Sequence, residues 1–274
     1  MRCLLWLLIV CAGSLQAEQR LRVVSLAPSM TELMLELHAE ELLVGVLDGP
    51  ERPPSLRDLP SVGRYGQLDL ERLLSLKPDL LLLWPGAVPG AQRAQLKHLG
   101  IASFSSDPHT LDQLIEQTQA LAVRLGRAEV GERRAGALRQ RLQALRERYR
   151  RTPPLPVFYQ VWDAPLYTVG GGQIISDALS VCGSRNVFAD LPQPAPLVSV
   201  EAVLQRDPQV ILVNEPGQLG AWQSWPQLSA VAAGRVLVVP DKGLERPSGQ
   251  MIEATARLCA ALAATGAATG PASR

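Results

Sequence analysis

Two glutamates occupy equivalent positions in an internal repeat, which makes them the first candidates for a specific role. Residues 68–83 align without gaps to residues 198–213, and Glu71 falls on Glu201. Each copy begins like a capped helix, and a carboxylate in the first turn of a helix interacts favourably with the helix dipole. Alternatively, two equivalent carboxylates could form a symmetric docking pair for a two-fold membrane partner. The repeat is compatible with both interpretations, because duplication alone produces the symmetry.

Four aromatic residues lie where a predicted strand ends or a loop begins, although only 4% of the chain is aromatic. Trp84 and Trp162 each follow an apolar run. Tyr65 lies in a glycine-containing turn, and Tyr167 precedes Gly170–Gly172. Flat rings can cover a large planar or polycyclic ligand, each burying about 150 Å² or more. The alternative is that each ring fills a core or a loop of the protein itself.

A charged segment follows the last predicted strand and could border the same ligand site. It consists of Lys242, Gly243, Leu244, Glu245 and Arg246. Its charged groups could hydrogen-bond to polar groups of a ligand. Alternatively, Glu245 and Arg246 could simply pair with each other.

Phosphate-binding, catalytic and metal-binding sites have little support in the residue pattern. Gly170–Gly172 could hold a phosphate at a helix N-terminus, but the common phosphate-binding glycine patterns are missing, which favours a plain turn. The chain has neither a GxSxG nor an HExxH motif, and no cysteine near a base. Its three histidines, His38, His98 and His109, are far apart, so we expect no zinc or manganese site. His109 could serve an enzyme, although an exposed loop histidine is the simpler interpretation.

Short apolar runs alternate with amphipathic stretches, a pattern typical of βαβ units and parallel sheets. Each copy of the repeat predicts a helix, a proline-marked turn and a buried strand, and residues 100–107 also resemble residues 234–241. We therefore expect two related α/β lobes. In open parallel sheets ligands bind beyond the carboxyl ends of the strands, so two facing sheets would share a cleft. The predicted strands are Arg22–Leu26, Leu42–Val46, Leu80–Trp84, Ile101–Phe104, Pro156–Val161, Val210–Val213 and Val236–Val239.

One long helical pattern separates the two halves. It covers residues 110–151, is interrupted at Gly126 and Gly131 and is stopped by two prolines. Leu138, Leu142 and Leu145 share one face of it. The arginines around them could attract an anionic partner, but a solvated face is the simpler interpretation. The predicted signal peptide, N-terminal lobe, helical segment with the interlobe helix, and C-terminal lobe cover residues 1–17, 18–109, 110–152 and 153–274.

Charge and composition exclude some classes of protein. The 274 residues include 27 Lys and Arg and 26 Asp and Glu, whereas nucleic-acid-binding proteins usually have a basic excess. With 47% hydrophobic residues, the chain is not expected to be disordered. Arg2, the apolar run Cys3–Ala12 and the small Ala17 predict a secretory signal peptide and export.

Removal of the signal peptide would leave Cys182 and Cys259 as the only cysteines. An isolated pair in an exported protein suggests a disulfide. Closing so long a loop would stabilise the fold by about 4 kcal/mol in the chain-entropy model. Two free, buried thiols are the alternative.

Several stretches resemble one known family. They are Ser25–Leu33, Leu70–Arg72, Lys77–Asp79, Val181–Gly183, Asn186–Phe188 and Glu245–Arg246. They are similar to the helical-backbone receptors for metal chelates, the class III periplasmic binding proteins, and among these to the cobalamin (vitamin B12) receptors of bacterial ABC importers. The resemblance runs from Arg22 to Leu262, nearly the whole chain after the signal peptide.

The resemblance implies the fold and function of such a receptor. A single long rigid helix would bridge the lobes, with little closure on binding. The protein would be a monomeric, non-enzymatic receptor of the periplasm that needs no cofactor and captures cobalamin in the interlobe cleft. It would deliver cobalamin to a membrane-embedded ABC permease dimer with its ATPase subunits. A receptor for haem or a ferric siderophore, a secreted enzyme, and a structural partner of an envelope complex remain alternatives.

Roles for individual residues follow from the same resemblance. Glu71 and Glu201 match glutamates that meet arginine pockets on the two permease subunits. Cys182 and Cys259 match the positions of a disulfide. Apart from Trp162, which is expected from its place after a strand, the ligand-binding residues also match family positions. The full set is Tyr65, Trp84, Trp162, Tyr167, Lys242, Gly243, Leu244, Glu245 and Arg246.

The chain also departs from the pattern of the cobalamin receptors. Gly49, Ala195 and Gly243 stand where such a receptor would carry an aromatic residue. Lys242 and Gly243 replace an Asp-Trp pair. These changes remove stacking surface and alter the charge of the site, so the resemblance leaves the exact chelate and its affinity open.

Overall fold

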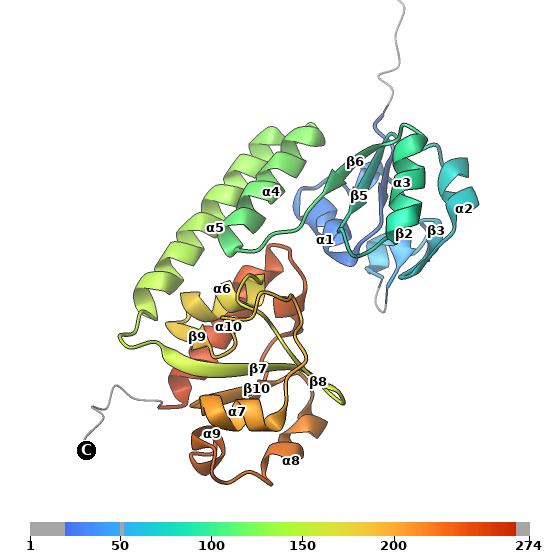
Figure 1. Cartoon of the computed structure of the whole chain (residues 1–274). Coiled ribbons are helices and arrows are strands. Elements are labelled where there is room, and N and C mark those ends of the chain that lie inside the picture. Colours follow the sequence, from blue (N-terminus) through green and yellow to red (C-terminus); the bar gives the residue numbers. More distant parts are fainter. Residues whose placement is uncertain (1–19, 50–51, 267–274) are drawn as a thin grey trace, which may run out of the picture.

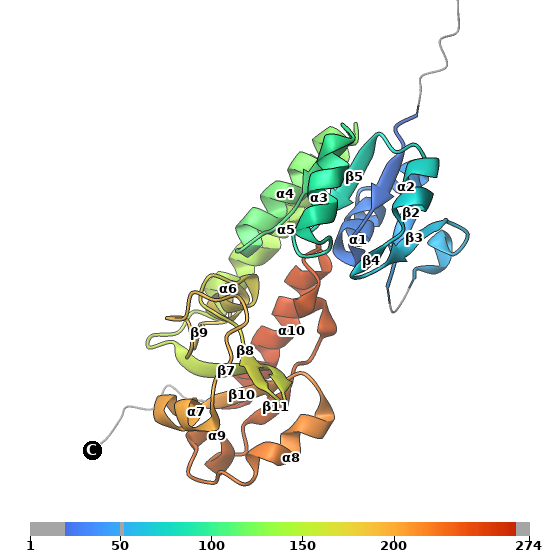
Figure 2. The same ribbon diagram turned by 45° about the vertical axis from the view of Figure 1, so that its right-hand side comes forward.

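The computed structural model describes residues 20–49 and 52–266. The predicted signal peptide lies outside these residues. Two β-sheets, each with its own helices, form two lobes, and a pair of long helices joins them (Figure 1, Figure 2). The α/β class and the two lobes predicted from the sequence are confirmed. The exact boundaries of the lobes stay a prediction.

The first lobe, here called the N-lobe, contains a six-stranded sheet with the order β4-β3-β2-β1-β5-β6. Its neighbouring strands are parallel except β3 and β4, which form an antiparallel hairpin. The strands are β1 (Val23–Ser25), β2 (Leu43–Asp48), β3 (Ser61–Arg64), β4 (Gln67–Leu68), β5 (Leu80–Leu83) and β6 (Ala102–Ser105). The helices are α1 (Pro28–Glu36), α2 (Leu70–Ser75) and α3 (Gly90–His98).

The second lobe, here called the C-lobe, contains a five-stranded sheet with the order β11-β10-β7-β8, in which β9 also pairs with β7. Only the pairing of β7 with β8 is antiparallel among the strands described. The strands are β7 (Leu155–Asp163), β8 (Leu166–Thr168), β9 (Ser184–Asn186), β10 (Val210–Val213) and β11 (Val236–Val238). The helices are α6 (Ile174–Val181), α7 (Val200–Arg206), α8 (Leu219–Trp222), α9 (Ser229–Ala232) and α10 (Gln250–Ala264).

The internal repeat has the structure that the sequence predicts. In the first copy, Asp69 caps α2 by accepting a hydrogen bond from the Arg72 N–H at 2.8 Å. In the second copy, Ser199 caps α7 by accepting one from the Ala202 N–H at 3.2 Å. Each cap contributes about 1 kcal/mol to the stability of its helix. The helices lead into β5 and β10, which occupy equivalent places in the two sheets.

The connection between the lobes differs from the expected single helix. It consists of two helices, α4 (Leu111–Arg124) and α5 (Ala128–Arg148). The chain reverses at Gly126, whose positive φ of 70° ends α4. At Gly131 the helices approach so closely that a Cβ atom would lie 2.2 Å from the Cβ of Ala122. Both glycines interrupt the helical pattern in the sequence, but the reversal of the chain between the two helices was not predicted.

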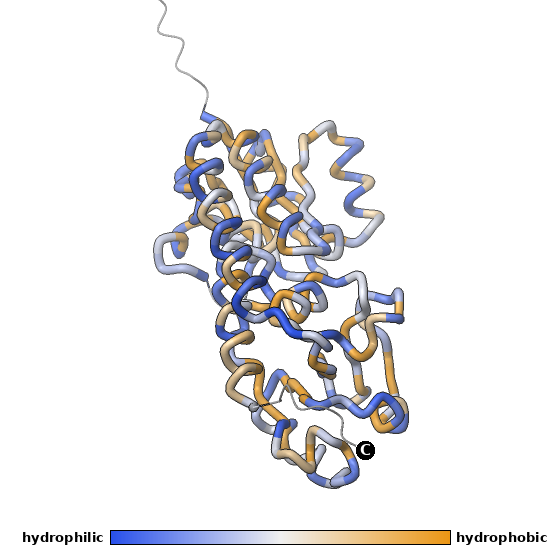
Figure 3. The backbone as a smooth tube through the Cα atoms, turned by 90° about the vertical axis from the view of Figure 1, so that its left-hand side faces the viewer, coloured by the Kyte–Doolittle hydropathy of each residue, from blue (hydrophilic) through white to orange (hydrophobic). Residues whose placement is uncertain are grey.

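Both of these helices contribute to the cores of both lobes. Leu114 at the start of α4 lies in the C-lobe core, and Leu121 near its end lies in the N-lobe core. In α5, Val130 packs against the N-lobe core, while Leu138 and Leu142 belong to the C-lobe core. Hydrophobic and hydrophilic residues alternate along the helices (Figure 3), as expected for elements with one buried face. None of the helices in the described ranges combines the length and apolar character that a membrane crossing requires.

A disulfide joins α10 to the end of α6 in the C-lobe. The sulfur atoms of Cys182 and Cys259 are 2.01 Å apart, and both residues are buried. The pairing predicted from the sequence is confirmed.

Candidate functional site

The carboxyl ends of the parallel strands carry two of the rings expected at the ligand, together with polar residues that the sequence did not single out. Trp84 follows β5 directly, and in the same sheet Asp48 ends β2. In the C-lobe, Trp162 lies near the end of β7, and Asn214 follows β10. Because the neighbouring strands are parallel, these ends lie at one edge of each sheet.

Direct contacts join the two lobes, one of them at the segment that follows the carboxyl end of β11. Glu32 of α1, the helix that follows β1, accepts hydrogen bonds from Arg246 Nη1 at 3.2 Å and from the Ser248 hydroxyl at 2.8 Å. Nδ1 of His109, beyond the end of β6, lies 2.6 Å from the carbonyl oxygen of Gly172. A ligand between the lobes would therefore meet both edges.

The N-lobe presents two exposed rings. Tyr65 lies at the tip of the β3–β4 hairpin and is 68% exposed. Trp84 is 41% exposed. Its ring folds over Gly86, where a Cβ atom would lie 2.4 Å from the ring. Gly86 therefore sets the position of the tryptophan.

The C-lobe presents a small apolar face. Trp162 in β7 pairs across the hairpin with Tyr167 in β8, so both side chains lie on the same face. Both residues belong to strands, whereas the sequence placed them in adjoining loops. Leu197 pairs with Tyr167 through an isolated bridge and is 62% exposed. It extends the face but has no distinguishing feature in the sequence, and we did not predict it.

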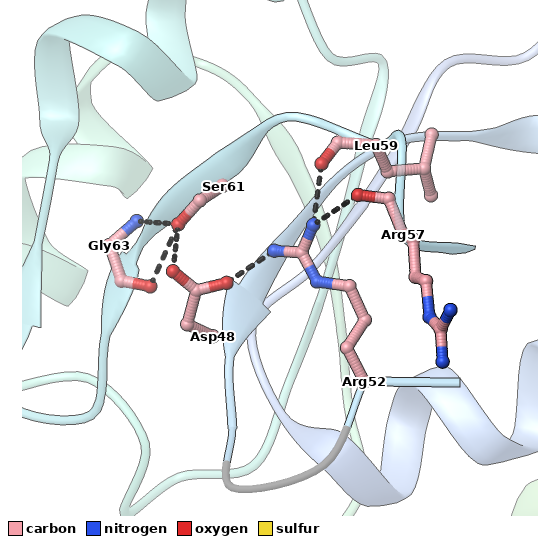
Figure 4. A network of polar contacts seen from close by, with 6 residues as sticks. All are labelled: Asp48, Arg52, Arg57, Leu59, Ser61 and Gly63. Atoms are coloured by element: carbon pink, nitrogen blue, oxygen red, sulfur yellow. Dashed lines mark hydrogen bonds and ion pairs between the residues drawn. The ribbon is translucent and has the colours of Figure 1, made fainter. Parts of the chain in front are cut away.

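A polar network holds the loop that precedes β3 (Figure 4). The Arg52 guanidinium donates to the Asp48 carboxylate and, at 2.7 Å, to the Leu59 carbonyl oxygen. The Ser61 hydroxyl donates to Asp48 Oδ2 at 2.6 Å and accepts from the Gly63 N–H at 3.2 Å. The network thus ties the end of β2 to the hairpin that carries the exposed tyrosine.

The charged segment after β11 forms a short 3₁₀ turn, Lys242–Glu245. One of its expected roles needs correction. Leu244 is completely buried in the C-lobe core, where it supports the turn and cannot face a ligand. Gly243 is also buried, and its N–H donates to the Asp241 carboxylate at 2.8 Å.

The charged residues of this segment pair with neighbouring groups, not with each other. Lys242 binds the Asn214 carbonyl oxygen at 2.8 Å. Glu245 accepts a hydrogen bond from the Asn214 side chain. Beneath them, burial raises the pKa of Tyr159, and the nearby charge of Glu245 adds to this effect. The Tyr159 hydroxyl has no hydrogen-bond partner within the described part of the chain.

The glycines before α6 serve backbone packing. The Gly170 and Gly171 N–H groups donate to the carbonyl oxygens of Pro194 and Leu191, at 3.2 and 3.1 Å. A Cβ atom at either glycine would lie 2.0 Å from a backbone oxygen of the 189–193 segment. Because these N–H groups are already used, the plain turn is the better interpretation than a phosphate site.

Both glutamates of the repeat are exposed at the N-termini of their helices, α2 and α7. Hydrogen bonds from its own N–H and from the Ser199 hydroxyl lower the pKa of Glu201. Among the residues described, neither Glu71 nor Glu201 forms an ion pair. Each helix leads into the start of a strand, β5 or β10, that runs toward the carboxyl edge of its sheet.

The remaining candidates offer no metal centre. Residues 20–49 and 52–266 contain no group of three or more His, Cys, Asp and Glu side chains that could hold a metal ion. Three arginines of α5 bind acidic side chains of other elements: Arg134 pairs with Glu36, Arg141 with Glu253, and Arg146 with Asp112.

The chain is similar to known proteins along most of its length. Residues 23–242 match the model of a family described as periplasmic binding protein. A vitamin B12-binding protein of Vibrio cholerae serotype O1 is 35% identical over 241 residues, 87% of each chain. A crystal structure of the periplasmic vitamin B12-binding protein of Vibrio cholerae matches with a TM-score of 0.80 and 35% identity, covering 89% of this chain and 97% of that chain. The periplasmic heme-binding protein of Roseiflexus sp. RS-1, in apo form, matches with a TM-score of 0.75 and 25% identity, covering 89% and 98%.

Proposed function

Because the chain belongs to the periplasmic binding protein family, we propose that it is a receptor that binds cobalamin between its two lobes and delivers it to an ABC transporter. The observation that carries the proposal is the set of rings at the carboxyl edges, with exposed Tyr65 and Trp84 on the N-lobe and exposed Trp162 beside half-buried Tyr167 on the C-lobe. The vitamin B12-binding relatives at 35% identity support this ligand over other chelates.

The geometry suggests how a corrinoid is held. Trp84 and Tyr65 stack on the ligand from the N-lobe, and the Trp162–Tyr167 face covers it from the C-lobe. Lys242 and Arg246 hydrogen-bond to its peripheral amides and carbonyl groups. Cobalamin is the cargo and no cofactor takes part. The protein has no catalytic role, and ATP hydrolysis in the transporter drives uptake.

Leu197 offsets one of the missing aromatic residues. It lies two residues after Ala195 and adds an exposed apolar side chain next to Tyr167. Gly49 and Gly243 carry no side chain that could contact the ligand. The ligand therefore contacts fewer rings than in a receptor with the full set, and more of its binding energy comes from polar groups.

The docking role of the paired glutamates belongs to the same proposal. Glu71 and Glu201 each contact one subunit of a permease dimer. Two equivalent carboxylates at matching helix ends suit a partner with two-fold symmetry. The receptor works as a monomer in the periplasm after loss of residues 1–17.

Calorimetric titration of the mature chain tests the ligand. Cyanocobalamin is expected to bind with one site per chain, and haemin and a ferric siderophore to bind more weakly or not at all. Haem remains the second candidate, because a heme-binding structure is similar and Tyr65 offers an exposed phenol that could ligate iron. Tight haemin binding that Tyr65→Phe abolishes, with no heat from any corrinoid, would establish that alternative.

Replacing the exposed tryptophan of the N-lobe tests the stacking arrangement. Trp84→Ala is expected to weaken cobalamin binding about tenfold, because an aromatic contact of this kind contributes about 1 kcal/mol beyond area burial. Gly86→Ala should weaken binding similarly, since a methyl group there displaces the ring. Leu99→Ala removes an equally exposed apolar side chain outside the site and serves as control. Unchanged affinity in Trp84→Ala would remove this ring from the site.

A further inference from the structure

Two glutamates of α1 face the C-lobe. Glu32 and Glu36 are four residues apart, so they lie on one face of the helix. Their side chains are only 11% and 12% exposed. A buried carboxylate must be paired or hydrogen-bonded, because desolvation of an unpaired charge is costly.

Both carboxylates find their partners in other parts of the fold. Glu32 accepts hydrogen bonds from Arg246 Nη1 and from the buried hydroxyl of Ser248. Glu36 accepts two from the Arg134 guanidinium of α5, at 3.2 and 3.3 Å. Burial raises the pKa of Glu36, while Arg134 and the backbone N–H of Gly249 oppose this rise. One helix face of the N-lobe is thereby fixed to the C-lobe and to the bridging helix.

The backbone approaches very closely at this point. A Cβ atom on Gly249 would lie 2.2 Å from Glu36 Oε2 and 2.5 Å from Arg134 Nη2. Gly249 has helical dihedral angles, φ −60° and ψ −22°, which any residue can adopt. The backbone conformation therefore admits other residues, and a methyl group here would displace the ends of the Glu36 and Arg134 side chains.

We propose that these residues form an interlobe latch that sets the angle between the lobes and positions the ligand segment. The latch consists of Glu32, Glu36, Arg134, Arg246, Ser248 and Gly249. Arg246 connects it to the site, because this residue ends the segment assigned to the ligand. The role of these residues in ligand binding rests on the proposed function, whereas their role in setting the angle between the lobes does not.

The bond to Glu32 leaves most of the Arg246 guanidinium for the ligand. A guanidinium carries five N–H donors, and the carboxylate is bound through one terminal nitrogen. The arginine side chain is 40% exposed. Glu32 is therefore a positioning residue, which holds the arginine in one orientation before the ligand arrives and so reduces the entropy cost of binding.

Interlobe distances test the geometry without any ligand. Nitroxide labels on Lys97→Cys in α3 and Ser224→Cys in the C-lobe, both exposed positions, report the separation by electron–electron double resonance. Gly249→Ala and Glu32→Gln should shift or broaden the distance distribution. Gly136→Ala is the matched control, since a methyl group there meets nothing within 4 Å. If both latch variants are folded, as judged by circular dichroism, and show the distance distribution of the parent, the proposal is wrong.

Binding kinetics test the positioning role. Glu32→Gln keeps the shape of the side chain and loses its charge, so cobalamin should bind about tenfold more weakly, mainly through faster dissociation. Gly136→Ala should bind like the parent. If Glu32→Gln changes the distance between the lobes but binds cobalamin with the affinity of the parent, the positioning role of Glu32 is wrong. If the parent binds no corrinoid, the proposed function fails while the distance measurements still decide the latch.

Discussion

Reversing both glutamates of the repeat, as Glu71→Lys together with Glu201→Lys, is expected to abolish cobalamin uptake and to leave cobalamin binding unchanged. Both side chains are exposed and lack ion pairs within the described residues, so lysine should be tolerated in the fold. At a docking interface each reversal replaces attraction to an arginine by repulsion. Removing an interface charge pair costs about 2–5 kcal/mol. Two such losses lower the affinity of the receptor for the transporter by several orders of magnitude.

Uptake of labelled cobalamin by vesicles or proteoliposomes that contain the transporter is the measurement. The matched control is Glu129→Lys with Glu132→Lys, which changes the net charge equally on an exposed stretch of α5. Each single reversal should reduce uptake, which shows whether the two sites contribute equally. If the double variant transports normally, the glutamates serve only the helix dipole. If it loses ligand affinity as well, docking and binding are not separate functions.

Removing the disulfide, as Cys182→Ala together with Cys259→Ala, is expected to lower the free energy of unfolding by about 4 kcal/mol. The bond closes a loop with a sequence separation of 77 residues, and in the chain-entropy model the stabilisation grows with loop length. Both cysteines are almost inaccessible, so the substitution also leaves a small cavity in the C-lobe core.

Chemical denaturation with and without a reductant measures this effect. The oxidised parent should unfold at a clearly higher denaturant concentration than the double variant. The reduced parent should resemble the variant, because only the cross-link has been lost. Equal midpoints for the oxidised and reduced parent would show that the disulfide does not stabilise the fold. Cobalamin affinity of the variant should stay near that of the parent at low temperature, since the bond lies between α6 and α10 and not at the ligand segment.

Much of the fold could be predicted because it depends on local patterns. Buried parallel strands are continuous apolar runs, and Leu80–Leu83 and Val210–Val213 were found with nearly correct bounds. Strand β9, by contrast, reads Ser-Arg-Asn and has no such run. Its place depends on distant contacts, such as the bond from the Asn186 amide to the Val169 carbonyl oxygen. The reversal at Gly126 also depends on packing, since a glycine can interrupt, bend or end a helix.

The candidate site was predicted only in part, for similar reasons. Trp84 could be placed because it directly follows a strand. Leu244 was misplaced, because its charged neighbours gave no indication that the turn points it into the core. Leu197 was missed because only its pairing with Tyr167 brings it to the apolar face. The ion pair of Glu32 with Arg246 joins residues that are 214 positions apart, so no local sequence pattern predicts it.

Helices α4 and α5 each contribute to the cores of both lobes, so the lobes resist rotation as separate bodies. We therefore expect the outline of the protein to change little when a ligand binds. A permease that touches only that outline then receives empty and loaded molecules alike. Receptors without ligand would compete for the same docking site on the permease. The rate of import would then depend on the fraction of receptors that carry ligand, not on their total number.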